Sequence, residues 1–200
     1  MKRILLTCAV FCLIISVSAS AQMSDFKGQT WLCGNLGYAF GMGDAFVSYT
    51  EPYSNTKFST DAGIGFGGQF YYGLQDKLLI GGELSLQSYT AKMSAPANLS
   101  LGIPEMDVST SETKFNVIVN TLYAVSQTRS SALFLSGGTG LYDFGGTQLG
   151  LNTGLVWRYQ VSDNVYLTGM PRFHVVFTDN TPMMIQLTMG AQFSLGGWLN

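Results

Sequence analysis

Apolar and polar side chains alternate with a period of two residues through several long stretches of this chain. In DAGIGFGGQFYY, residues 61–72, Ile64 and Phe66 share one parity, while Asp61 shares the other with glycines. GTQLGLNTGLVWRY, residues 146–159, repeats the pattern. Successive side chains of a strand point to opposite faces, so each stretch has one apolar and one polar face. The stretches exceed the usual length of about five or six residues, and about eleven tilted residues cross a bilayer. The pattern predicts a membrane-spanning β-barrel.

The amino-terminal segment has the pattern of a secretory signal peptide. Two basic residues precede an apolar run over residues 4–17, and the small-residue sequence ASA follows. The run is short for a spanning helix, and no other stretch reaches the ~18 apolar residues that such a helix requires. We predict cleavage after Ala21, so that residues 1–21 are the signal peptide and residues 22–200 form one barrel domain.

Composition limits the function classes. Without Lys2 and Arg3, eight of the ten basic residues remain against twelve acidic ones, a formal charge of −4 that disfavours a nucleic-acid partner. Cys33 alone remains after cleavage, which excludes an intramolecular disulfide and a cysteine metal cluster. Charged residues make up 11% of the chain, against ~25% in typical soluble domains. We therefore expect part of the surface to face something other than water.

The alternation predicts an all-β fold, an eight-stranded antiparallel up-and-down transmembrane β-barrel. The first and fifth strands are the least regular, because Gly34 interrupts the first and Leu133 and Phe134 are adjacent in the fifth. The eight strands cover residues 30–40, 60–73, 77–91, 112–125, 132–143, 147–160, 165–178 and 184–195.

Connection lengths indicate which end of the barrel is external. Outer-membrane barrels have short periplasmic turns and longer external loops. The connections at 73–76, 126–131 and 161–164 are short and are predicted to be periplasmic. Loop 92–111 contains two prolines and two acidic residues, so we expect it to be mobile. The predicted external loops are 41–59, 92–111, 144–146 and 179–183.

A secretory signal followed by eight amphipathic strands, closing with MIQLTMGAQFSL and an aromatic Trp198, resembles the small outer-membrane barrels of the OmpA and OmpX type in Gram-negative bacteria. The resemblance covers residues 22–200 and implies a place in the outer membrane after Sec-type export. It also implies outer-membrane lipids, lipopolysaccharide, periplasmic chaperones and the barrel-insertion machinery as partners. One departure is that Leu199 and Asn200 follow Trp198, whereas the family usually ends at or very near an aromatic residue.

Charged side chains on the polar parity are predicted to fill the lumen. An eight-stranded barrel leaves an interior just wide enough for side chains, and buried charges are costly unless they pair. We predict a mid-barrel cluster of Glu83 with Arg158 and Arg172. Nearer the external rim we predict a pair of Asp61 with Lys114.

This lumen charge network has two interpretations, a gate in a narrow channel or a plug that satisfies buried charges. The narrow interior favours the plug. We therefore predict a structural or surface-interaction protein that acts in envelope integrity or in adhesion to host or cell-surface ligands through loops 41–59 and 92–111. The alternative is a porin-like diffusion channel for small solutes.

The residues do not favour an enzyme, a metal site or a cofactor. Small outer-membrane barrels include deacylases, acyl transferases and proteases, but acyl chemistry needs a base beside a hydroxyl nucleophile. His174 is the single histidine and precedes Val175 and Val176, so we expect a lumen histidine hydrogen-bonded to its neighbours. GIGFGG at 63–68 and GGTG at 137–140 lie in strand-like stretches and open no helix, unlike nucleotide-binding loops. Their small residues are expected to make room for bulky side chains.

Aromatic side chains are expected on the lipid face or in the interfacial girdle, where they are enriched. A soluble periplasmic ligand-binding barrel of the lipocalin kind would turn the apolar parity inward, because a period of two does not say which face is wet. The scarcity of lysine and glutamate on the polar parity favours the membrane barrel. The aromatic residues assigned to the lipid face or girdle are Trp31, Tyr38, Tyr72, Tyr123, Trp157 and Tyr159.

Overall fold

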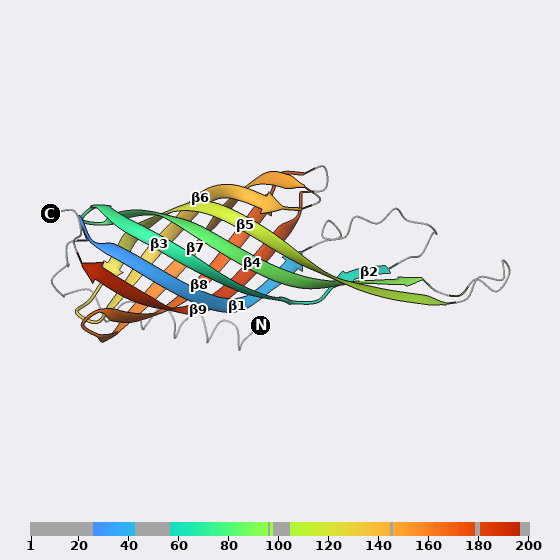
Figure 1. Cartoon of the computed structure of the whole chain (residues 1–200), viewed down its shortest axis with the longest axis horizontal. Coiled ribbons are helices and arrows are strands. Elements are labelled where there is room, and N and C mark those ends of the chain that lie inside the picture. Colours follow the sequence, from blue (N-terminus) through green and yellow to red (C-terminus); the bar gives the residue numbers. More distant parts are fainter. Residues whose placement is uncertain are drawn as a thin grey trace, which may run out of the picture.

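The computed structural model describes residues 26–42, 57–95, 97, 105–144, 146–178 and 181–196. The signal peptide, most of the predicted loop 41–59 and Trp198 lie outside these residues. Within them the chain is almost entirely strand (Figure 1). The strands are β1 (Thr30–Met42), β2 (Lys57–Thr60), β3 (Gly63–Gln75), β4 (Leu78–Ala95), β5 (Met106–Gln127), β6 (Ser131–Asp143), β7 (Thr147–Ser162), β8 (Val165–Val176) and β9 (Met183–Gly196).

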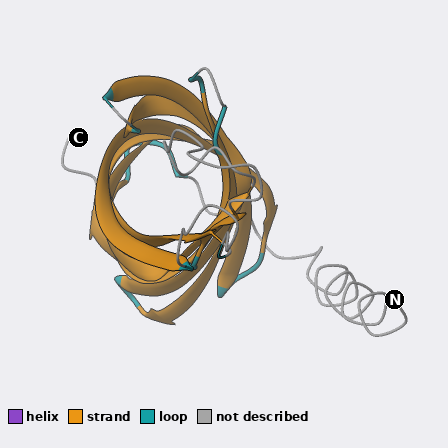
Figure 2. Ribbon diagram, turned by 90° about the vertical axis from the view of Figure 1, so that its right-hand side faces the viewer, coloured by secondary structure: helices purple, strands orange, loops and turns teal. Residues whose placement is uncertain are grey.

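The strands form one closed antiparallel ring. Their order is β2-β4-β3-β1-β9-β8-β7-β6-β5, and pairing of β4 with β5 closes the barrel (Figure 2). β2 and β3 both pair with β4, and only Asp61 and Ala62 separate them, so they form one interrupted barrel strand. The predicted eight-stranded antiparallel up-and-down barrel is confirmed.

The connections divide the barrel into two ends. At the turn end, two or three residues join β3 to β4, β5 to β6 and β7 to β8, and β1 begins and β9 ends there. The opposite end, which we call the hairpin end, carries the β4–β5 connection. The predicted alternation of short turns at one end and longer connections at the other is therefore confirmed.

The predicted mobile loop 92–111 is wrong over much of its length. β4 continues to Ala95 and β5 begins at Met106, with Lys92 opposite Ser109 in a regular ladder. Figure 1 shows this hairpin reaching well beyond the ring. The prediction relied on the prolines and acidic residues of this segment and missed its alternation, in which Met93 and Val108 are paired on one parity and Lys92 and Ser109 on the other. The β-branched residues of the segment also favour an extended chain.

The apolar parity faces outward. Leu36 on β1, Val119 on β5 and Leu151 on β7 are 61%, 53% and 49% exposed, and their strands lie on different parts of the ring. A soluble barrel with its apolar side chains inside is therefore wrong for this chain. Among the described residues, no helix has the length and apolarity needed to cross a membrane.

The lumen is less polar than the sequence suggested, because two apolar clusters lie inside it. Trp31 is a correction: it is fully buried instead of joining the girdle, since it shares the inward parity of β1 with Cys33. Tyr38, Trp157 and Tyr159 are exposed on the outer wall as expected. The cluster nearer the turn end comprises Phe26, Trp31, Cys33, Tyr71, Leu79, Leu122, Ala124, Ala132, Phe134, Val156 and Met170. The cluster nearer the hairpin end comprises Ala39, Tyr89, Ile118, Tyr142, Val176 and Met184.

Inward-facing glycines make room for tyrosine rings on neighbouring strands. A Cβ added to Gly81 would overlap the Tyr71 ring and the carbonyl oxygen of Phe70. A Cβ added to Gly150 would lie 2.7 Å from a ring carbon of Tyr142. The structural interpretation of the lumen glycines therefore holds, with the modification that the bulky partners come from adjacent strands.

Candidate functional site

A buried ion pair crosses the middle of the lumen. Glu83 on β4 and Arg172 on β8 face one another across the ring, because β3, β1 and β9 lie between their strands. Arg172 Nη1 donates to Glu83 Oε2, and Nη2 donates to Oε1 at 2.7 Å. Their side chains are 0% and 1% exposed. Such a bidentate contact fixes both orientation and distance between opposite walls.

Three amide side chains complete this layer. Gln69 and Asn120 each donate to Glu83 Oε2 at 3.0 Å, while Gln186 Oε1 accepts a bond from Arg172 Nη2 at 3.0 Å. Gln69 is the cross-strand neighbour of Glu83, and Gln186 is that of Arg172, so sheet register brings these side chains together. Desolvation of a buried pair is offset only when further hydrogen bonds satisfy the charges. This layer supplies such bonds to both charged groups, although Arg172 Nε and the amide oxygens of Gln69 and Asn120 have no partner among the described residues.

His174 extends the network toward the hairpin end. Its Nε2 lies 3.0 Å from Gln186 Oε1, and its Nδ1 lies 2.9 Å from the Tyr142 hydroxyl. The amide oxygen of Gln186 is only an acceptor, so Nε2 carries a proton and donates. In the neutral ring, Nδ1 then accepts from Tyr142. The histidine therefore links two side chains of the lumen, and neither of these two partners is a serine or a threonine.

Arg158 is not part of the Glu83 cluster, contrary to the prediction. On β7 the cross-strand partner of Arg172 is Gly154, and Arg158 lies four residues further toward the turn end. Four strand residues correspond to about 13 Å, so parity placed Arg158 on the right face at the wrong depth.

Four aromatic rings surround the guanidinium of Arg158. Ring faces attract such a cation by about 0.5–2 kcal/mol each, depending on desolvation. Within the part of the chain that is described, no carboxylate forms an ion pair with it. Its guanidinium carbon lies 4.9, 4.9, 5.1 and 4.7 Å from the ring centres of Phe26, Trp31, Phe134 and Tyr166. We call this arrangement the aromatic box.

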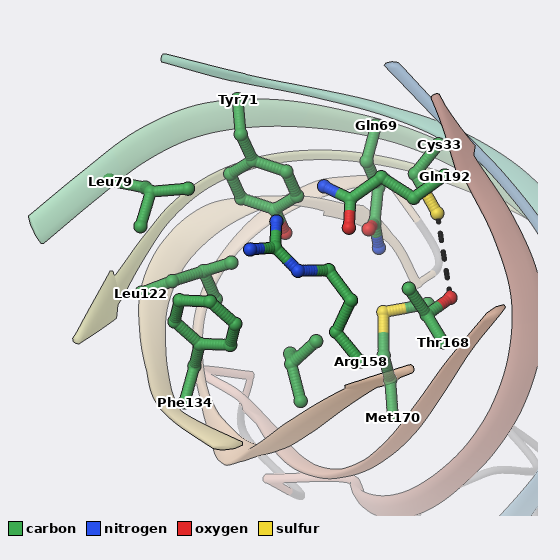
Figure 3. Close-up of a pocket in the computed structure, with 11 residues that line it drawn as sticks. Cys33, Gln69, Tyr71, Leu79, Leu122, Phe134, Arg158, Thr168, Met170 and Gln192 are labelled. Atoms are coloured by element: carbon green, nitrogen blue, oxygen red, sulfur yellow. Dashed lines mark hydrogen bonds between the residues drawn. The ribbon is translucent and has the colours of Figure 1, made fainter. Parts of the chain in front are cut away.

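Figure 3 shows the part of the lumen between the aromatic box and the ion-pair layer. The Arg158 side chain extends between Tyr71, Leu122 and Phe134, while Cys33 lies beside Gln69 and Gln192. Cys33 Sγ is 3.7 Å from Thr168 Oγ1. The space among these side chains is about 10 Å³, on the order of one water-sized sphere. The apolar cluster and the ion-pair layer together therefore fill this part of the lumen.

The predicted pair of Asp61 with Lys114 is wrong. Asp61 lies in the interruption between β2 and β3, where its Oδ2 is 2.7 Å from Lys92 Nζ. Lys114 instead pairs with Glu112 and lies 5.4 Å from the ring centre of Phe144. Both ion pairs lie near the hairpin end, and the Asp61 and Lys92 side chains are each about half exposed.

Sequence reasoning also missed the partners of the network. Their position on the polar parity was the only sequence feature that placed these residues in the lumen. The residues are Gln69, Asn120 and Gln186. Their depth follows from pairing between strands, which one strand read alone does not reveal. Among the described residues, no group of three histidine, cysteine, aspartate or glutamate side chains could hold a metal ion.

Comparison with known proteins identifies the fold. No protein-family model matches the sequence, and neither does any curated protein. OprG of Pseudomonas aeruginosa, an outer-membrane protein, has a TM-score of 0.59 and 12% identity, covering 87% of this chain and 99% of its own. Neisserial surface protein A has a TM-score of 0.57 and 15% identity, covering 84% and 97%. The chain therefore has the fold of the small eight-stranded outer-membrane β-barrels of the OmpA and OmpX type.

Proposed function

We propose that the chain is an integral outer-membrane barrel with a surface-interaction role, carried by the β-ribbon that extends from its hairpin end. The barrel wall supplies the membrane anchor, and the packed lumen blocks passage. The observation that carries the proposal is the length of β4 and β5, which exceeds that of the other strands and continues past the ring (Figure 1).

The outer wall supports the membrane location. Large apolar side chains are exposed on every strand from β3 to β9 and on β1. In water such a continuous surface would drive association, whereas a bilayer covers it. With the turn end in the periplasm, lipids and lipopolysaccharide contact the wall, and the ribbon projects outward. Detergent-dependent extraction and heat-modifiable migration test this location.

The external ribbon comprises β2, residues 90–95 of β4 and residues 106–111 of β5. Its described side chains include many hydroxyls, and the Thr90 and Ser111 hydroxyl oxygens are 3.0 Å apart across the ladder. In the described ladder, β6 first pairs with β5 at Asn116, so the ribbon has an edge that no barrel strand covers. Exposed edges of this kind accept an added strand from a partner.

The register allows the ribbon to be shortened without altering the barrel wall. Because Lys92 and Ser109 are opposite one another, residues 93–108 can be replaced by Asn-Gly, which favours a tight hairpin. We expect this variant to keep heat-modifiable migration and to lose most binding of cells to host or abiotic surfaces. Lys92→Ala, which leaves the ribbon backbone intact, is the matched control. Unchanged adhesion and unchanged envelope integrity in the shortened variant would contradict the proposal.

The closed lumen distinguishes this role from the porin-like alternative. The Glu83 and Arg172 pair spans the interior, and apolar clusters lie on both sides of it. We expect no large, stable openings in planar bilayers. A steady conductance that changes in the Glu83→Gln variant would show that the charge network is a gate and not a plug.

Biogenesis of the barrel requires export and insertion. We propose removal of residues 1–21 after Ala21, followed by delivery through periplasmic chaperones to the barrel-insertion machinery. Mass spectrometry of the purified membrane protein should give a chain that begins at Gln22. The proposed role includes no catalytic step and no cofactor.

A further inference from the structure

We infer that the cavity at the turn end is a binding site for a small anionic group, a carboxylate or a phosphate, with Arg158 as its central cation. This site is separate from the external ribbon and does not depend on the proposed surface role. In the membrane orientation proposed above, it opens toward the periplasm.

The cavity has a volume of about 220 Å³ and lies between the aromatic box and the β5–β6 turn. Arg158 and Tyr166 form its inner wall, and Thr128, Arg129 and Ser130 form its rim. Gln160 adds an amide from β7. The lining thus combines two guanidinium groups with hydroxyl and amide donors, which is the donor set that carboxylate and phosphate oxygens require.

Arg158 is the observation that points to a ligand. The residue is 4% exposed, yet within the described chain no carboxylate pairs with it. The aromatic rings attract its charge through their faces, but they are poor acceptors for the N–H groups at the edge of the guanidinium plane. The acidic residues of the neighbouring turns, Asp76 and Asp163, are exposed and do not line the cavity. An anion entering the cavity would supply the missing counter-charge.

Arg172 shows how a carboxylate neutralises a buried arginine in the same barrel, although its Nε has no hydrogen-bond partner among the described residues. Glu83 accepts from both of its terminal nitrogens, and Gln186 accepts a further bond. Arg158 has the same burial and the same chemistry but faces the cavity instead of a carboxylate. The difference makes Arg158 available to a ligand.

The rim of the cavity is held in place by its own hydrogen bonds. Thr128 N donates to the Ser131 carbonyl at 2.7 Å, and Ser131 N donates to Thr128 Oγ1 at 3.0 Å. These bonds fix the turn that presents Arg129. Such preorganisation lowers the entropy cost of binding.

The floor of the aromatic box is also fixed. Gly28 N donates to the Gly73 carbonyl at 2.8 Å, and Gly73 N donates to the Gln29 carbonyl at 2.9 Å. A Cβ at Gly73 would overlap the carbonyl oxygen of Phe26. The segment before β1 therefore packs against the barrel wall and keeps Phe26 beside Arg158.

Arginine side-chain NMR tests the inference on the intact barrel. Residues 22–200 contain three arginines, Arg129, Arg158 and Arg172, so the Nε–Hε spectrum of the detergent-solubilised protein should hold three signals. We expect inorganic phosphate, titrated against chloride at constant ionic strength, to shift the Arg158 and Arg129 signals saturably. The Arg172 signal should stay fixed and serves as the internal reference. No saturable shift, or an equal shift of all three signals, would overturn the site.

Two variants identify the residues that hold the anion. Arg129→Ala should weaken phosphate binding about tenfold, on the order expected for the loss of one hydrogen bond to a charged group. Lys77→Ala removes the same charge from an exposed turn at the same end and should leave binding unchanged. Equal effects of the two variants would show nonspecific attraction and would contradict the site.

Arg158→Lys tests the central cation while preserving its charge. Lysine lacks the planar fork that contacts two oxygens, so we expect at least a tenfold loss of phosphate affinity with heat-modifiable migration retained. Unchanged phosphate affinity in this variant would show that Arg158 does not bind the anion. Competition by acetate separates the ligand classes: displacement of phosphate at equal concentration assigns the site to carboxylates, and failure to displace it assigns the site to phosphates.

Discussion

Arg158 and Arg172 project into the same lumen from adjacent strands, yet they are neutralised in different ways. Arg172 on β8 reaches across the ring to Glu83 and is enclosed by amides. Arg158 on β7 lies nearer the turn end, where aromatic faces surround it. The first arrangement joins two walls through specific hydrogen bonds, whereas the second holds a cation through less directional attraction and leaves N–H donors for other partners. A buried arginine can thus join two walls of the barrel in one layer and keep donors for another partner in a different layer.

The ion-pair layer should show the largest stability effect. Arg172→Met leaves the Glu83 carboxylate buried without its partner, and we expect it to lower the free energy of unfolding by about 3–5 kcal/mol. Urea unfolding in phospholipid vesicles, followed by heat-modifiable migration, measures the change. The double variant Glu83→Gln with Arg172→Met removes both charges and should recover at least half of the loss. No recovery would mean that packing, and not the orphaned charge, causes the effect.

The aromatic box should tolerate loss of its cation much better. Arg158→Met preserves the apolar stem and removes a charge that no described carboxylate satisfies, so we expect a loss of about 1–2 kcal/mol from weakened ring contacts. The same unfolding measurement applies. A loss as large as that of Arg172→Met would erase the proposed difference between the two arginines.

The link from Tyr142 to His174 should have a smaller effect. Tyr142→Phe keeps the ring beside Gly150 and removes one hydroxyl, which should cost about 0.5–1.5 kcal/mol. The His174 ring signals in an NMR spectrum should shift, while the Arg172 Nε–Hε signal stays near its original position. An unchanged histidine spectrum would show that the two side chains do not share a hydrogen bond.

The exposed pair near the hairpin end should matter least. Lys92→Ala breaks its contact with Asp61, and we expect a loss of about 0–1 kcal/mol that declines at high salt. Unfolding at low and high ionic strength measures both features. A loss above that of Tyr142→Phe would show that the interruption between β2 and β3 depends on this ion pair.

The sequence predicted the strands correctly wherever one face of the strand meets lipid. The alternation around Phe66 and Leu151 placed those side chains outward, as the structure does. Residues 106–111 were missed although Met106 and Val108 alternate there with Asp107 and Ser109, because the prediction relied on the prolines and acidic residues of the loop. It also misplaced Trp31, because an aromatic residue at the end of a strand is suited to an interface as well as to the interior.

The position of a side chain along the barrel axis could not be predicted from the sequence, because alternation determines only whether the side chain points inward or outward. Arg158 and Arg172 share the inward parity, but the β7–β8 register sets Arg172 beside Gly154 and separates the two cations. Asp61 and Lys114 were assigned to one another on height alone, while pairing between adjacent strands gave each a nearer partner.

By itself, the sequence determined that this chain forms a barrel with an apolar wall, because the period of two is a local property of each strand. Only the tertiary structure decided which charges meet, because register and ring closure bring together residues far apart in the chain. Closure placed Glu83 opposite Arg172, and the same register left Arg158 among aromatic rings at the mouth of a cavity.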